Sequence, residues 1–247
     1  MKKSFSVIFC SLFLILSLNS WAEFSNQLLP DLGNLAKLVA EADRSKIEKE
    51  VYDVNGRFSS NLPAPDSAGG RTAEQLAHML SGGSEPLRQR LIAAFLGNRD
   101  RFLKNLTDSN YAVNDMGVAY AASFILLWEL ASNRELSRLA SEQAASFLIH
   151  AFSKMNGEYA KIGLDERAMA YDWLTTIPVV MTSLVMAFEK DGRQREVVML
   201  REKSASLFLN AFKMPHNMLS ISESGVISMD VDKVVAYQQR YGIGGIR

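Results

Sequence analysis

Apolar residues recur at three- and four-residue steps over most of the chain after Gly70, which is the period of an amphipathic helix. Ser84 is expected to cap one of these helices, and Gly97 or Asn98 is expected to end it. Ser132 and Glu135 have the spacing of a capping box and predict another helix start. The predicted helices cover 72–80, 85–97, 116–131, 133–162, 166–190 and 193–212, with a short amphipathic segment at 102–106.

Alternating apolar and polar residues, the pattern of a half-buried strand, do not form a run longer than a few residues before Leu219. The connections between the predicted helices are short, which favours antiparallel neighbours. The sequence therefore predicts an all-α fold, an antiparallel helical bundle or array of about six to eight helices.

Two predicted helices contain long apolar runs, at 116–130 and 173–188. Each run is shorter than the roughly 20 residues that a membrane-spanning helix needs. We expect both helices to be buried at the centre of the fold, and no transmembrane span in the mature chain. Pro178 lies inside the second run, where it removes one backbone hydrogen bond from its helix.

The first 22 residues have the layout of a secretory signal peptide. Lys2 and Lys3 precede an apolar run of 12 residues at 7–18 that is interrupted only by two serines, and small residues follow, with Ala22 last. We expect cleavage after Ala22 and a periplasmic or secreted mature protein. Cys10 leaves with the signal peptide, so thiolate zinc sites, cysteine nucleophiles and redox chemistry are excluded for the mature chain.

Breaks in the helical pattern divide the rest of the chain. Residues 23–50 read as a helical N-terminal arm, and 51–70 as a linker dense in Gly, Pro, Asn and Ser. Residues 71–225 form the predicted helical main domain, and 226–247 a C-terminal extension.

Charge excludes one class of partner. The chain has 27 Lys plus Arg and 27 Asp plus Glu, so loss of the two signal-peptide lysines leaves a net charge of −2. A slightly acidic chain without a basic stripe is unlike a nucleic-acid-binding protein, and no nucleic-acid partner is expected.

Several short stretches resemble an uncharacterised family of exported bacterial all-helical proteins. They are Leu103 with Asn114-Asp115-Met116, Ala119, Ala122 and Trp128-Glu129, then Asp165-Glu166-Arg167, then Leu219 to Gly225. The resemblance covers roughly 103–225. It implies an exported all-helical domain, and it implies no activity and no catalytic residue.

Three side chains are the candidates for chemistry: Glu129, His150 and His216. Glu129 follows an apolar helix and is expected to be partly buried. A buried carboxylate needs a partner, and Arg134, Arg138 or Arg167 is expected to supply a structural ion pair.

His150 lies among apolar residues, and His216 follows a proline in a loop. No ligand set for a metal and no cofactor motif is present, so neither is expected.

These observations favour a non-enzymatic accessory, adaptor or inhibitor protein, of which an immunity-like factor is one form. The expected partner is an envelope or secreted protein. The alternative is a periplasmic enzyme or small-molecule binder with a cleft between helices.

Overall fold

The computed structural model describes residues 53–66, 69–154, 156–212 and 214–229, together with 232, 233, 236, 237 and 240. The predicted signal peptide at 1–22 and the predicted arm at 23–50 lie outside the described residues. So does most of the predicted C-terminal extension at 226–247.

The described part of the chain is mostly helical, with 70% of its residues in helices and one two-stranded sheet. Six of its helices have ten residues or more, and the all-α prediction is confirmed. The elements are α5 (Arg71–Leu80), α6 (Glu85–Asp108), α7 (Met116–Ser132), α8 (Arg138–Ser153), α9 (Asn156–Tyr159), α10 (Leu164–Lys190), α11 (Gln194–Phe212), η2 (His216–Met218), β1 (Leu219–Ile221) and β2 (Ile227–Met229).

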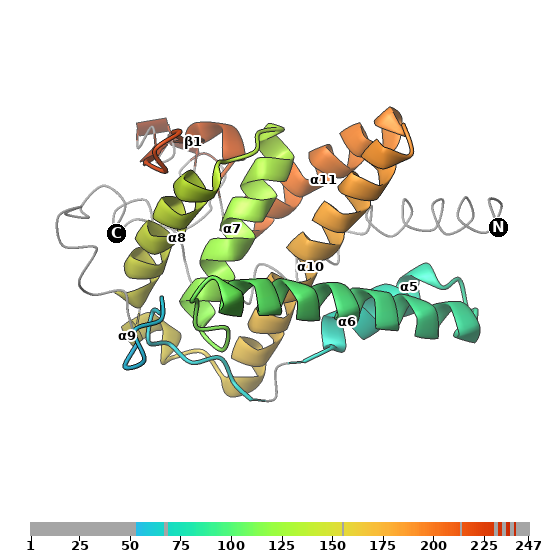
Figure 1. The fold of residues 1–247 in the computed structure, drawn as a ribbon, viewed down its shortest axis with the longest axis horizontal. Helices are drawn as coiled ribbons and strands as arrows, with labels where there is room; N and C mark the ends of the chain where they lie inside the picture. Colours follow the sequence, from blue (N-terminus) through green and yellow to red (C-terminus); the bar gives the residue numbers. More distant parts are fainter. Residues whose placement is uncertain are drawn as a thin grey trace.

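Helix α7 is the centre of the fold and contacts α8, α10 and α11 (Figure 1). Its sequence carries no charge before Glu129, so every side of the helix can face apolar neighbours. Twelve of its 17 residues are buried. Tyr120 and Phe124 pack against Phe152 of α8 and Phe212 of α11, with ring centroids 4.8–5.2 Å apart.

Helix α10 runs through Pro178, and α7 supplies the hydrogen bond that this proline cannot make. The N–H of residue 178 would bond the carbonyl of Leu174, four residues earlier. Proline has no N–H. The buried hydroxyl of Ser123 donates to the Leu174 carbonyl instead, at 2.5 Å.

Helix α10 is also the one described helix that is long and apolar enough to cross a membrane. In its most apolar stretch, 72% of the residues are buried inside the fold. Such burial is typical of a core helix, as the sequence pattern indicates.

The prediction that Gly97 or Asn98 ends a helix is wrong, because α6 continues to Asp108. A glycine inside a helix costs about 1 kcal/mol relative to alanine, which is too little to stop a helix with tertiary contacts. The buried side chains of Phe95 and Arg99 lie on either side of Gly97 and hold α6 to the core.

The predicted helix start at Ser132 is also wrong. Asn133 takes a left-handed conformation (φ 53°) and ends α7, and the next helix begins five residues later. Its cap is Ser137, whose hydroxyl accepts from the Ala140 N–H. A capping-box spacing that overlaps the end of another helix is therefore misleading here.

The short strands β1 and β2 form an antiparallel hairpin, so part of the predicted C-terminal extension pairs with the end of the predicted main domain. Gly225 in the connecting turn has a positive φ of 72°. A Cβ at this position would lie 2.5 Å from the Ala140 carbonyl oxygen, so the turn is in close contact with α8.

Candidate ligand-binding cavity

A cavity of about 370 Å³ lies between α6, α7 and α8. It exceeds the roughly 150 Å³ of an apolar cavity that binds benzene, and it falls in the range of known small-molecule pockets. Its wall is mostly apolar: Phe102, Leu106, Tyr111, Val118, Ala121, Ala122, Ile125, Leu126, Ala145 and Ile149.

The small side chains of α7 help to make this space. Ala121 and Ala122 face α6 and α8 where larger residues would fill the gap. Glu129 lies two turns further along α7, next to the N-terminal end of α8, where Arg138 and Glu142 also line the cavity. The charged groups therefore gather where the end of α7 meets the start of α8.

Glu129 is half-buried, and one of its carboxylate oxygens is already in use. Oε1 accepts from the Leu136 N–H at 2.7 Å, in the connection between α7 and α8. Burial raises the pKa of this carboxyl above its ordinary value, the hydrogen bond from Leu136 lowers it, and the charge of Glu135 raises it further. The net direction is upward, because burial is the largest of these three effects.

The ion pair expected for Glu129 is not formed with any of the three predicted arginines. Arg134 lies over the Trp128 ring, with its guanidinium carbon 5.6 Å from the ring centroid. Arg138 pairs with Glu142 at 2.7 Å, one helical turn away on α8. Arg167 donates to the carbonyls of its own connection at the start of α10.

The two histidine candidates lie away from the cavity wall. His150 is a buried residue of α8, next to the cavity-lining Ile149. His216 begins η2, and its burial lowers its pKa. Of the three predicted site residues, Glu129 alone lines this cavity.

Two other buried carboxylates, Asp115 and Asp172, bond segments that are far away in the sequence, and the sequence did not predict this role. Asp115 caps α7, as its position before Met116 predicts, through a bond from the Val118 N–H. It also accepts from the hydroxyls of Ser59 and Ser60 at 2.8 Å each, and from the N–H groups of Ser60 and Leu62.

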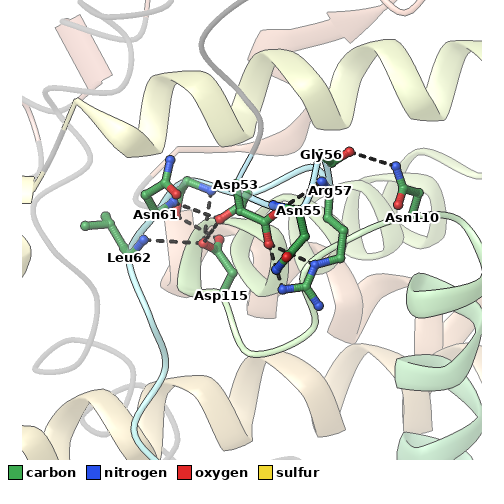
Figure 2. A network of polar contacts seen from close by, with 10 residues as sticks. Asp53, Asn55, Gly56, Arg57, Asn61, Leu62, Asn110 and Asp115 are labelled. Atoms are coloured by element: carbon green, nitrogen blue, oxygen red, sulfur yellow. Dashed lines mark hydrogen bonds and ion pairs between the residues drawn. The ribbon is translucent and has the colours of Figure 1, made fainter.

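Figure 2 shows Asp115 below the turn at 53–62, which it holds against the start of α7. Within that turn, Asp53 accepts from the N–H groups of Asn55 and Arg57 and from the Arg57 side chain. Within the predicted linker at 51–70, Ser59, Ser60 and Leu62 are thus bonded to the start of α7. Both oxygens of Asp115 have partners, so this carboxylate has no capacity left for a ligand.

Asp172 of α10 has the same role at the start of α5. It accepts from the N–H groups of Gly70 and Thr72 at 2.9 and 2.6 Å, and Arg99 of α6 lies 3.3 Å from it. Both residues of this charge pair are almost fully buried. A charge pair at this depth is costly unless hydrogen bonds complete it, and here the backbone supplies them.

Among the residues that the structure describes, no group of three or more potential ligands lies together as a metal site would require. Asp115 and Asp172 bind the protein's own backbone. Of the two carboxylates that line the cavity, Glu142 is paired with Arg138, and Glu129 has no ion pair with any described residue.

The serine contacts that reveal the anchors are separated from Asp115 by more than 50 residues. No local spacing signals such a contact.

No family model, no curated protein and no solved structure matches the chain. The resemblance over 103–225 and the protein partner stay predictions, and the function is proposed from the cavity.

Proposed function

We propose that this protein is a non-catalytic small-molecule binder that holds an apolar ligand in the cavity between α6, α7 and α8. In this proposal the chain is exported, loses residues 1–22 and acts in the periplasm or outside the cell. The observation that carries the proposal is a 370 Å³ cavity with an apolar wall and charged groups gathered at one end.

The distribution of polar groups favours binding over catalysis. An apolar wall with few polar groups is typical of sites that orient a ligand. Acid–base catalysis needs a second group positioned beside the reacting atom. Glu129 is incompletely bonded, whereas Arg138 and Glu142 are paired with each other.

The test uses 1-N-phenylnaphthylamine, an uncharged aromatic dye whose emission rises in apolar surroundings. We expect saturable binding to the mature chain. Ala122→Phe fills the cavity from α7 and should weaken binding by at least about tenfold, a loss of about 1.4 kcal/mol.

Ala131→Phe is the matched control, because Ala131 lies on the same helix, is also half-buried and does not line the cavity. Its affinity for the dye should equal that of the wild type. Equal affinity in the wild type and Ala122→Phe would refute the proposed function, and so would the absence of saturable binding to the wild type.

A further inference from the structure

The charges around the cavity indicate the chemical class of its ligand. The lining contains two carboxylates, Glu129 and Glu142, and one guanidinium, Arg138. Arg138 bonds Glu142, with its Nε 2.7 Å from Oε1. If all three groups are charged, the lining carries one excess negative charge, and it belongs to Glu129.

The hydrogen bonds of Glu129 leave room for a donor from a ligand. Oε1 accepts from Leu136, and Oε2 accepts from none of the described residues. A partly buried carboxylate is stabilised by an opposite charge or by further hydrogen bonds. Of the neighbouring arginines, Arg134 is stacked on Trp128 and Arg138 is paired, so a cation from outside would complete the site.

The apolar wall fixes the other half of the ligand. Ile125 and Ala122 continue the face of α7 that carries Glu129, one and two turns away, and both line the cavity. A ligand whose charged end meets Glu129 would therefore place its body against apolar side chains. An anionic ligand such as a fatty acid would meet two carboxylates at the same end.

We propose that the cavity selects amphipathic amines, in which a protonated amino group pairs with Oε2 of Glu129 and an alkyl or aromatic body fills the space between α6, α7 and α8. This inference rests on the proposed function and adds its ligand class. Glu129 is then a specificity-determining residue, and the apolar wall supplies affinity that does not depend on charge.

The experiment compares three eight-carbon probes that share a body and differ in the head: n-octylamine, 1-octanol and octanoate. Each displaces 1-N-phenylnaphthylamine from the mature chain at pH 8, where the amine is protonated and the carboxylates are ionised. We expect octylamine to displace the dye at a concentration at least about tenfold below that of octanol, as a charge-assisted hydrogen bond predicts. Octanoate should be the weakest of the three.

Glu129→Gln should abolish the preference for octylamine over octanol, because the amide keeps the shape and removes the charge. Glu142→Gln is the matched control. Combined with Arg138→Gln, it removes one charge of each sign from the lining, leaves the excess negative charge on Glu129 and should retain the preference. Far-UV circular dichroism verifies the fold of both variants.

The outcomes separate the two proposals. If octanol displaces the dye and octylamine is no better, the ligand class is wrong and the cavity still binds apolar molecules. The same conclusion follows if the octylamine preference survives Glu129→Gln. If the dye does not bind the wild type saturably, the proposed function itself fails.

Discussion

Substituting Ser123 by alanine tests how the core tolerates a proline inside α10. The Leu174 carbonyl has lost its helical donor to Pro178, and the Ser123 hydroxyl is its replacement. Ser123 and Leu174 are both fully buried, so water cannot take over the bond. An unpaired buried carbonyl costs about 1–3 kcal/mol. Alanine has a higher helix propensity than serine, which offsets this cost by up to about 0.5 kcal/mol.

The expected net loss for Ser123→Ala is therefore about 0.5–2.5 kcal/mol in the free energy of unfolding. Urea titration followed by far-UV circular dichroism measures it. Ser204→Ala is the matched control, since Ser204 is equally buried and donates to the Leu200 carbonyl of its own helix. That carbonyl keeps its backbone donor, so this variant should lie within about 0.5 kcal/mol of the wild type.

A double-mutant cycle with Pro178→Ala isolates the cause. Alanine at 178 restores an N–H for the Leu174 carbonyl, so Ser123→Ala should cost at least about 1 kcal/mol less in that background. The cycle cancels the packing change caused by losing the proline ring. Equal costs in both backgrounds would refute the compensation, as would a Ser123→Ala cost no larger than that of Ser204→Ala.

Three further predictions concern the anchors, the hairpin and the cavity. Asp115→Ala leaves several buried donors without an acceptor and should cost about 3 kcal/mol or more, with faster proteolysis within 53–66. Unchanged proteolysis would contradict the anchoring role. Gly225→Ala should destabilise more than Gly192→Ala: both glycines have φ near 70°, a strain of about 1–2 kcal/mol for alanine, and only Gly225 meets neighbouring atoms. Equal urea midpoints would argue against the contact. Glu129→Gln should stabilise the fold at about pH 7 and have little effect at about pH 4. The pKa of the Glu129 carboxyl is raised in the folded state above its unfolded value of 4.5, so its protonated form favours folding at low pH. This stabilisation is lost as the pH rises through the folded pKa, and the uncharged amide avoids the loss. Urea titrations at both pH values measure the stability of the variant relative to the wild type, and an equal difference at the two pH values would refute the prediction.

The helices that could be predicted best are those with strong local signals. Asp115 lies before an uninterrupted apolar stretch, and α7 begins at the predicted residue. α11 begins and ends within one residue of its predicted bounds. Helix α6 differs, because Gly97 is a weak local signal that the packing of Phe95 and Arg99 overrides.

The candidate cavity was only partly accessible to sequence reasoning. An acid at the end of an apolar helix indicates partial burial, and Glu129 is half-buried. Its missing ion pair depends on where three arginines lie in space, and each found another partner. Arg138, for example, bonds Glu142 four residues along its own helix, a local contact that competes with any approach to Glu129.

The two aspartate anchors impose an order on folding during synthesis. The N–H groups of Ser60 and Thr72 find their acceptors on Asp115 and Asp172, which emerge from the ribosome 55 and 100 residues later. Contacts over such separations form slowly because the intervening chain must first be ordered. The segment at the start of α5 therefore waits, undocked, while the next 100 residues are translated. A nascent chain that postpones closure in this way stays in the unfolded form that a protein-conducting channel accepts, which suits the proposed export.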